Sequence, residues 1–307
     1  MNTSAASPKP GRLGIGVIGA GKVGAVLGAA LRAAGHAVVG VSAVSEASRE
    51  RAENLLPGVP VLEIPDIVER AELVLLAVPD DALAGLVEGL AATGAWQPGQ
   101  LVVHTSGRHG TAVLEPARGR GAIPLAVHPA MTFTGMSLDL RRLPDCAFGI
   151  TAPAAVLPIA QALVVEMGAE PVVIAEADRP LYHAALAHAS NHLVTIASQA
   201  AQLLGAVGVE RPDRVLGPLM KASLENALSS GEGLLTGPIA RADARTVRAH
   251  GEALAEHGVR DVVEAYRGMA KATTSRAMAR GVLSAEQGEA LLDALADAPG
   301  PERGVER

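Results

Sequence analysis

The sequence predicts an α/β protein in which a doubly wound parallel sheet is followed by an all-helical domain. Short apolar runs alternate with helical segments from residue 13 to about residue 176, and the strand signals then stop. Apolar strands that alternate with helices are typical of a parallel sheet covered on both faces. These observations divide the chain into a tail at 1–12, a sheet domain at 13–176, a helical domain at 177–298 and a second tail at 299–307.

Apolar runs and the periodic segments between them predict the elements of the sheet domain. Each run has the length of a strand, and each periodic segment is long enough for a helix. We expect strands at residues 13–19, 38–41, 73–78, 101–104, 125–127, 146–151 and 171–174. We expect helices at residues 24–34, 45–56, 80–92 and 154–167.

The second half opens with a helix start at Asp178, Arg179 and Pro180. An acidic cap followed by proline in the first turn is typical of a helix N-terminus. The predicted helices cover residues 178–204, 211–229, 243–256, 259–279 and 284–296.

Composition excludes several classes of protein. With 307 residues, 49% of them apolar, the chain is long enough to bury a sizeable core. A net charge of -6, with only one Trp, two Tyr and two Phe, argues against a nucleic-acid partner. The single cysteine, Cys146, and an N-terminus unlike a secretory signal predict a cytoplasmic protein. Polar residues interrupt the longest apolar stretch, residues 184–209, so we expect a buried helix and no membrane span.

A glycine-rich turn after the first predicted strand is the strongest local signal. In GIGVIGAGKVG, residues 14–24, three glycines form the pattern GxGxxG. The first permits a tight turn, the second lets the backbone approach a pyrophosphate, and the third lets the helix pack closely on the strand. The pattern predicts a NAD(P)-binding Rossmann domain over residues 13–176, with an ordinary glycine-rich turn as the alternative interpretation. The predicted pyrophosphate contacts are Gly19, Gly21, Lys22, Val23 and Gly24.

The end of the second predicted strand favours NADP over NAD. NAD-specific folds usually carry an acidic residue there, which binds the ribose 2'-hydroxyl. This chain has Ser42 and Ser45 instead, with Arg49 and Arg51 just beyond. We expect Ser42, Ser45 and Arg49 to meet the 2'-phosphate, because charge-assisted hydrogen bonds contribute about 1.5–3 kcal/mol. The alternative is that the arginines form only a solvated helix face.

The carboxyl ends of three further predicted strands complete the expected cofactor site, because ligands of open parallel sheets bind outside these ends. Val78 and Pro79 should run beside the ribose and nicotinamide. His104 and Ser106 should border the nicotinamide, with His128 beside them, where imidazole can shuttle a proton near neutral pH. Each histidine can equally be a satisfied core residue.

The long predicted helix carries a polar stripe, because His183, Ala187 and Asn191 share one face. A buried histidine and asparagine need partners, which are either substrate oxygens or the groups of a structural network or dimer seam. His188 and His192 have half the spacing of a zinc site, but no third ligand is evident, so we predict no metal.

A turn at residues 235–243 offers two substrate ligands, Thr236 and Arg241, ahead of a helix that Asp243 caps. Thr236 and Arg241 can clamp a carboxylate. Alternatively, Arg241 pairs with a neighbouring acid at the surface, which contributes little to stability.

Six motifs carry a resemblance over nearly the whole chain between the tails. They are VIGAGKVG at 17–24, LLAVPDDAL at 75–83, HTSG at 104–107, HPAMTF at 128–133, YHAALAHASNHL at 182–193 and LTGPIARAD at 235–243. Through these motifs the sequence resembles a Rossmann-like oxidoreductase family. The C-terminal half of that family is a domain of unknown function with the helical fold of six-phosphogluconate dehydrogenase. More distantly, the sequence is similar to ketopantoate reductase and pyrroline-5-carboxylate reductase.

In ketopantoate reductases the long helix carries a catalytic lysine, followed by asparagines four and eight residues later. If Asn191 matches the second asparagine, the lysine position falls on His183 and the first asparagine on Ala187. The resemblance therefore implies the same site, with His183 as the acid that protonates the developing alkoxide. Pyrroline-5-carboxylate reductases, whose imine substrate needs less help with protonation, lack this lysine as well.

The sequence thus predicts an NADPH-dependent reductase that acts on a small 2-oxo acid of the ketopantoate type or on a cyclic imine. His183 is the expected proton donor, Asn191 orients the substrate, and Arg241 binds its carboxylate. One alternative is an NADP-binding sensor without turnover, and another is a helical half that serves mainly for dimerisation. We expect a homodimer whose partner is a small-molecule substrate, with no nucleic-acid or membrane partner.

Overall fold

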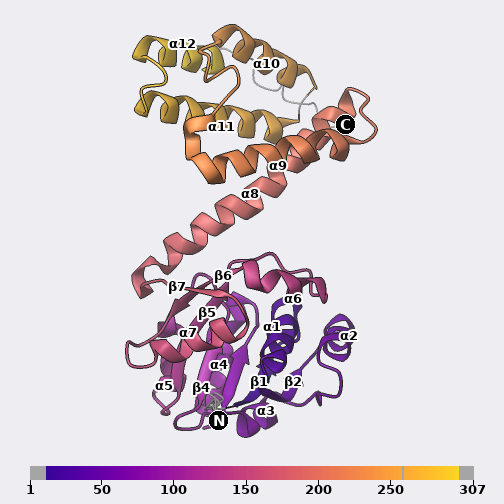
Figure 1. Ribbon diagram of the computed structural model, residues 1–307, viewed down its shortest axis with the longest axis vertical. Coiled ribbons are helices and arrows are strands. Elements are labelled where there is room, and N and C mark those ends of the chain that lie inside the picture. The colour runs from indigo at the N-terminus through magenta and orange to yellow at the C-terminus, as the bar shows by residue number, and fades with distance from the viewer. Residues whose placement is uncertain (1–11, 258, 297–307) are drawn as a thin grey trace, which may run out of the picture. The chain divides into compact units, whose positions relative to one another are not determined.

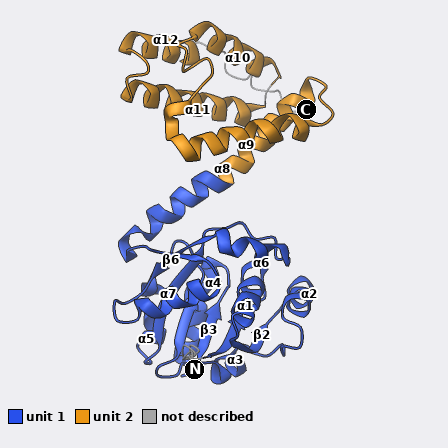
Figure 2. Ribbon diagram, viewed as in Figure 1, with its two compact units in different colours: residues 1–190 blue, residues 191–307 orange. Residues whose placement is uncertain are grey.

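A computed structural model of the chain describes residues 12–257 and 259–296 (Figure 1). The chain falls into two compact units, Met1–Ser190 and Asn191–Arg307 (Figure 2). Apart from Arg12, the tails predicted at 1–12 and 299–307 lie outside the described residues. The boundary between the two units falls inside helix α8 (Arg179–Ala206), and the domain boundary expected at residue 176 stays a prediction.

A seven-stranded sheet forms the first unit, with the strand order β2-β1-β3-β4-β5-β6-β7. Neighbouring strands are parallel except for β5 and β6. The predicted α/β class, a doubly wound sheet followed by a helical region, is confirmed. The strands are β1 (Gly14–Ile18), β2 (Ala37–Ser42), β3 (Leu73–Leu76), β4 (Leu101–His104), β5 (Ile123–Pro129), β6 (Ala147–Thr151) and β7 (Glu170–Val173).

Strand β6 corrects the expectation that every strand is parallel. His128 in β5 pairs with Gly149 in β6 in antiparallel register. A parallel neighbour needs a crossover connection, usually a helix that packs across the sheet. The connection between β5 and β6 holds only the short helices α6 (Leu138–Arg142) and η2 (Leu143–Asp145), so the chain turns back beside β5.

Helices cover both faces of the sheet, as Figure 1 shows. The short segments α3 (Ile64–Arg70), η1–α5 (Thr111–Leu114 and Glu115–Arg118) and α6–η2 were not expected from the sequence, because each is too short to show a helical period. The helices of the first unit, besides α6, η2 and the start of α8, are α1 (Lys22–Ala33), α2 (Glu46–Leu55), α3 (Ile64–Arg70), α4 (Asp80–Ala92), η1 (Thr111–Leu114), α5 (Glu115–Arg118), α7 (Leu157–Glu166) and η3 (Glu176–Asp178).

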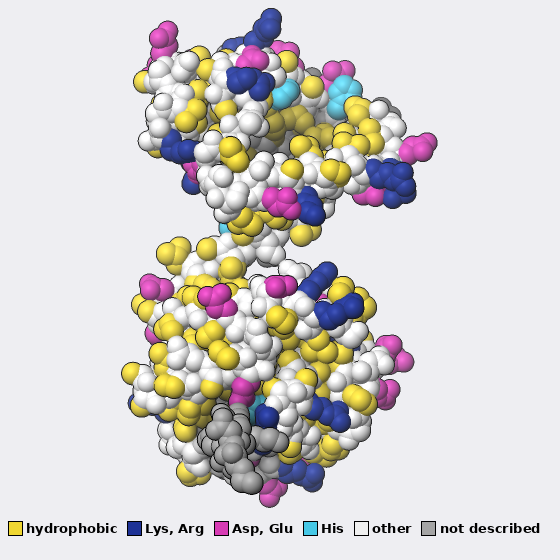
Figure 3. Space-filling view, in the orientation of Figure 1, with side chains coloured by type: hydrophobic (Ala, Val, Ile, Leu, Met, Phe, Trp, Pro, Cys, Tyr) yellow, Lys and Arg dark blue, Asp and Glu magenta, His cyan; other side chains and the backbone are white. Residues whose placement is uncertain are grey.

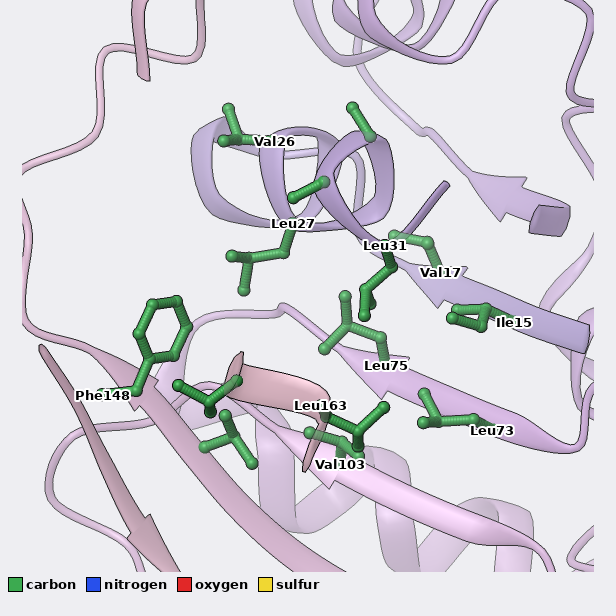
Figure 4. Close-up of a cluster of buried hydrophobic side chains, with 14 of the residues drawn as sticks. Ile15, Val17, Val26, Leu27, Leu31, Leu73, Leu75, Val103, Phe148 and Leu163 are labelled. Atoms are coloured by element: carbon green, nitrogen blue, oxygen red, sulfur yellow. The ribbon is translucent and has the colours of Figure 1, made fainter. Parts of the chain in front are cut away.

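Two hydrophobic clusters lie on opposite faces of the sheet, since successive strand side chains alternate between the faces. Leu73 and Leu75 belong to the cluster beneath α1 and α7, which also holds Phe148 (Figure 4). Val74 and Leu76 belong to the other cluster, beneath α3 and α4. This continuous burial holds the carboxyl ends of the strands in a fixed row along one edge.

The second unit is helical and has its own small core. Val247, Ala270 and Leu291 are buried where α10, α11 and α12 pack together. In the part of the chain that the structure describes, no helix is long and apolar enough to cross a membrane. Acidic and basic side chains are interspersed over the face seen in Figure 3. The elements after α8 are α9 (Pro212–Ser230), η4 (Gly231–Leu234), α10 (Ala244–His257), α11 (Arg260–Ala279) and α12 (Ala285–Ala296).

Candidate functional site

The turn between β1 and α1 requires two of its glycines for packing. Gly19 has φ +98, and a Cβ there would lie 2.6 Å from the carbonyl oxygen of Ala77. A Cβ on Gly24 would overlap the carbonyl oxygen of Gly19 and lie 2.8 Å from the Cβ of Ala77. Because Gly19 and Ala77 directly follow β1 and β3, these glycines let α1 start directly against the sheet.

Gly21 has a different role, because nothing lies within 4 Å of the position that its Cβ would occupy. Gly21 is the N-cap residue of α1, and the described first turn, Lys22 to Gly24, holds no acidic side chain and no side-chain cap. The first backbone N–H groups of a helix attract anions. Open space at a helix N-terminus fits the pyrophosphate of a dinucleotide, for which Gly21, Lys22 and Val23 were predicted.

Ser42, the last residue of β2, and Ser45, which follows the strand, both hold the local backbone in place. The Ser42 hydroxyl accepts a hydrogen bond from Gly19 N at 2.9 Å. Ser45 is the N-cap residue of α2, and its hydroxyl accepts from Ser48 N at 3.2 Å. Each hydroxyl keeps its own proton for a further acceptor, so both remain compatible with phosphate binding.

Arg51, not Arg49, is the arginine that lies against the glycine-rich turn. Arg51 Nη1 donates to the carbonyl oxygen of Ala20 at 3.0 Å. A Cβ on Gly135 would lie 2.9 Å from Arg51 Cδ and 3.1 Å from Lys22 Cγ, so both cations border this loop. Arg49 is exposed on α2, as its alternative interpretation stated. The helical period could have identified Arg51, because Ser48 and Ala52 on the same side of α2 are buried.

The loop that borders these cations is fastened by a buried carboxylate that sequence reasoning missed. Asp139 is 0% exposed. It accepts hydrogen bonds from Thr134 N and Gly135 N at 2.8 Å each, and from the Thr134 hydroxyl at 3.0 Å. Asp139 thereby fixes the loop after β5 beside the turn.

Val78 and Pro79 lie at the carboxyl end of β3, next to the turn. Ala77 N donates to the carbonyl oxygen of Ile18 at 2.9 Å, which joins this segment to β1. Pro79 is the N-cap residue of α4. Both residues therefore lie where the sequence placed them, one strand away from the glycines.

His104, the last residue of β4, is a core residue whose ring nitrogens are both hydrogen-bonded within the protein. The alternative interpretation therefore holds for this histidine. It is 0% exposed. Ser106 N donates to His104 Nδ1 at 3.2 Å, so the proton lies on Nε2 and is donated to the carbonyl oxygen of Gly110 at 2.8 Å. Burial and the nearby Arg179 charge lower the pKa of His104 to about 4. The ring therefore shapes the Ser106 segment and keeps both nitrogens engaged inside the protein.

Arg179, the first residue of α8, is a fully buried cation that sequence analysis took for part of a helix start. Its Nε donates to the Thr151 hydroxyl at 2.8 Å, and its Nη2 donates to the carbonyl oxygens of Ala126 and Gly149 at 3.2 and 3.0 Å. Its Nη1 lies 3.5 Å from the carbonyl oxygen of Ser106. These hydrogen-bond acceptors, among the described residues, are all neutral, and the nearby Glu176 carboxylate adds a favourable charge interaction with the guanidinium.

His128 and His183 meet over Gly107. A Cβ on Gly107 would lie 2.6 Å from His183 Cδ2 and 2.9 Å from His128 Nε2. The two rings are 6.1 Å apart and nearly perpendicular. His128 Nδ1 is 2.9 Å from the Tyr182 hydroxyl. Burial, together with the charges of Arg179 and His183, lowers the pKa of His128 to about 4. The structure thus brings together two of the three predicted catalytic residues.

The remaining predicted residues belong to the second unit. Asn191 is exposed on α8, and its carbonyl oxygen accepts from the Thr195 hydroxyl at 3.3 Å. Thr236 lines a cavity of about 460 Å³ between α9 and η4. Arg241 is exposed, and its backbone N–H closes the turn onto Gly237 at 3.3 Å. Their roles toward a substrate stay predictions. The predicted cap is confirmed, because Asp243 accepts from Thr246 N at 3.0 Å.

Within residues 12–257 and 259–296, no group of three or more His, Cys, Asp or Glu side chains is arranged to hold a metal ion. His188 and His192 both lie on α8.

Two family models match the chain. Residues 1–129 match the Rossmann-like domain, and residues 146–273 match the Domain of unknown function (DUF2520). No curated protein sequence matches the chain. The N-terminal part is therefore a Rossmann-like domain joined to a DUF2520 region, as the motifs implied. The more distant relation to ketopantoate reductase and pyrroline-5-carboxylate reductase stays a prediction.

Solved structures share this fold over most of their length. A Bacteroides fragilis protein assigned by name to the NADP oxidoreductases is 22% identical, with a TM-score of 0.71 over 85% of this chain and 98% of that one. An imine reductase from Myxococcus stipitatus in complex with NADP+ is 18% identical, with a TM-score of 0.63 over 92% and 100%. A reductive aminase from Aspergillus terreus in complex with NADPH and ethyl-5-oxohexanoate is 17% identical, with a TM-score of 0.65 over 92% and 99%. At these identities the similarity concerns the fold.

Proposed function

We propose that the protein is an NADPH-dependent oxidoreductase that reduces a small 2-oxo acid of the ketopantoate type, or a cyclic imine, by hydride transfer. The observation that carries the proposal is the row of groups along one edge of the sheet. The open turn at Gly21 follows β1, Val78 and Pro79 follow β3, and Gly107 follows β4 beside His128. Three strand spacings of about 5 Å separate β1 from β5, roughly 14 Å, which suits an extended dinucleotide.

The cation beside the turn supports NADP as the cofactor. Arg51 is held at Ala20, and the described end of β2, through Ser45, presents hydroxyls and no acidic side chain. A guanidinium can bind a 2'-phosphate through two parallel hydrogen bonds. The names of the neighbouring structures, which include complexes with NADP+ and NADPH, support the same cofactor.

Bound NADPH would supply the hydride. The chain's own residues then have two tasks, which are to orient the substrate and to supply the proton that completes the reduction. His183 lies against Gly107 beside His128 and is the proposed proton donor to the developing alkoxide. Asn191, Thr236 and Arg241 are the proposed substrate ligands, with Arg241 for its carboxylate.

An NADP-binding sensor without turnover is the second candidate. The long helix favours this candidate. By its resemblance to the long helix of ketopantoate reductases, His183 stands in place of their catalytic lysine and Ala187 in place of their first asparagine. The imine reductases among the neighbouring structures support the enzyme and its imine alternative.

The test is to mix the protein with NADPH and a panel of ketopantoate, other branched 2-oxo acids and pyrroline-5-carboxylate, and to follow the loss of NADPH. Turnover of a panel member supports the reductase and chooses between carbonyl and imine chemistry. Tight NADPH binding without turnover of any member favours the sensor. A protein that binds neither NADPH nor NADH contradicts both candidates.

A homodimer is the oligomer that we propose. Of the 28 residues of α8, Arg179 alone is buried among the described residues. Leu181 and Val194 on this helix are 74% and 65% exposed, which is costly for large apolar side chains facing water. A second copy of the chain would cover them. Sedimentation should give a dimer that Val194→Glu weakens, and a wild-type monomer would contradict the proposal.

A further inference from the structure

We propose that His128 presents a neutral Nε2–H group to the substrate's carbonyl oxygen, and that Tyr182 is the positioning residue that fixes this tautomer. The inference rests on the proposed function and deepens it. A donor of this kind selects a carbonyl substrate over a cyclic imine.

The surroundings of Tyr182 indicate the direction of its hydrogen bond with His128. The Tyr182 oxygen lies against β6, where a Cβ on Gly149 would be 2.5 Å from it, and the hydrogen bond described for this hydroxyl is the one to His128 Nδ1. The phenolic proton is then free to be donated to His128 Nδ1, 2.9 Å away. With Nδ1 as acceptor, a neutral imidazole carries its proton on Nε2.

The Nε2 edge of His128 lies close to Gly107. Nε2 would lie 2.9 Å from a Cβ at this position, and His183 Cδ2 would lie 2.6 Å from it. The two rings already fill the space that a side chain on residue 107 would need, and glycine lets them pack against the backbone after β4. His128 is half-buried, and the described hydrogen bonds engage only its Nδ1, so its Nε2 is left for a substrate oxygen.

The groups that face His128 come from three elements, and most of them oppose a second proton on the ring. Arg179 and His183 lie on α8, His104 ends β4, and Asp80 begins α4. Burial lowers the pKa of His128 to about 4, Arg179 and His183 contribute in the same direction, and only Asp80 opposes them. The ring is accordingly neutral at physiological pH and acts as a donor without net charge.

The buried Arg179 guanidinium discriminates between 2-oxo acid and cyclic imine substrates. Hydride transfer to a carbonyl carbon places negative charge on the oxygen, which a fixed donor and the nearby Arg179 stabilise. Hydride transfer to an imine proceeds through a protonated, positively charged nitrogen. That nitrogen has no lone pair to accept from His128, and Arg179 repels it. The site therefore favours the 2-oxo acid.

Nitrogen-15 NMR tests the tautomer without any substrate. Long-range proton–nitrogen correlations should show His128 as the Nε2–H tautomer down to about pH 5, assigned by the loss of its signals in His128→Gln. Tyr182→Phe should shift His128 toward a mixture of tautomers. The matched control is Tyr266→Phe, because the Tyr266 hydroxyl lies 2.9 Å from His250 Nδ1 in the second unit, and it should leave the His128 signals unchanged. An Nδ1–H tautomer in the wild type, or a charged His128 at pH 6, overturns the proposal.

Kinetics test the choice of substrate. His128→Leu should lower kcat for the 2-oxo acid about 10²–10³-fold, as the loss of an oxyanion donor does. His128→Gln, which keeps a neutral N–H donor, should recover at least about tenfold of that loss. Faster turnover of the cyclic imine than of every 2-oxo acid overturns the inference while leaving the reductase standing. Absence of all NADPH-dependent turnover defeats the proposed function, and the NMR result then decides the tautomer alone.

Discussion

Replacing Gly24 with alanine places a methyl group where the carbonyl oxygen of Gly19 already lies. The new Cβ would also be 2.8 Å from the Cβ of Ala77, whereas ordinary contacts begin near 3.4 Å. Because both neighbours are backbone-fixed, α1 must move away by at least several tenths of an ångström. Such overpacking costs typically 1–3 kcal/mol, about 3 kcal/mol in this rigid setting. The gain in helix propensity from glycine to alanine returns about 1 kcal/mol.

The net destabilisation of about 2 kcal/mol corresponds to a fall in Tm of roughly 4–8 °C for a unit of this size. Gly21→Ala is the matched control, because nothing lies within 4 Å of its Cβ and its φ of -70 suits any residue. Calorimetric scans of the ligand-free proteins should therefore show Gly24→Ala melting early and Gly21→Ala within about 2 °C of the wild type.

Gly21→Ala, the variant with the smaller effect on Tm, should have a large effect on NADPH binding. A methyl group on Gly21 occupies the space assigned to the pyrophosphate, so Gly21→Ala should weaken NADPH binding at least about tenfold in titration calorimetry. Wild-type NADPH affinity in a folded Gly21→Ala variant would refute the placement of the pyrophosphate. An unchanged Tm in Gly24→Ala would refute the packing argument.

Three further predictions concern charge and protonation. Arg51→Ala should weaken NADPH binding about tenfold to hundredfold and leave NADH binding unchanged. Replacing the exposed Arg49 with alanine should change neither affinity, and equal losses of NADPH affinity in the two variants would show that Arg51 has no special role. His183→Ala should lower kcat by about 10²–10⁴ with the NADPH Kd intact, and unchanged turnover would remove it from the mechanism. The pKa values of His104 and His128, about 4 in the folded protein, lie below the ordinary 6.5, so the unfolded chain binds more protons between these values. Urea unfolding should show the free energy of unfolding falling as the pH drops from 6.5 toward 4, by on the order of 3 kcal/mol per histidine, and a flat profile would contradict the burial argument.

Local sequence signals predicted the elements that depend on local physics. Strand β4 and helix α4 have the expected bounds, because an uninterrupted apolar run and a helical period are visible without tertiary context. The direction of β6 was not visible, since an apolar run is the same in either direction and only the connection through α6 decides it. Helix α3 has seven residues, too few for a period to stand out.

The glycine-rich turn of the site was predictable from the sequence, because only glycine fits such a tight strand-to-helix turn. Backbone packing at the turn requires Gly19 and Gly24, and Gly21 leaves open space at the start of α1. Arg179 could not be recognised, because its burial depends on carbonyl oxygens that come from β5, β6 and the segment after β4. Tyr182 stands next to the predicted His183, yet its contact with His128 depends on where α8 begins over the sheet.

Transfer of a labelled hydride tests the central claim most directly. The protein is incubated with ketopantoate and NADPH that carries deuterium at the hydride-donating carbon, and the product is analysed by mass spectrometry. The account predicts a 2-hydroxy acid with one deuterium on the former carbonyl carbon, formed much more slowly by the His183→Ala variant. Failure to find deuterium in any reduced product of the substrate panel, from a protein that binds NADPH tightly, would contradict the reductase and favour the sensor.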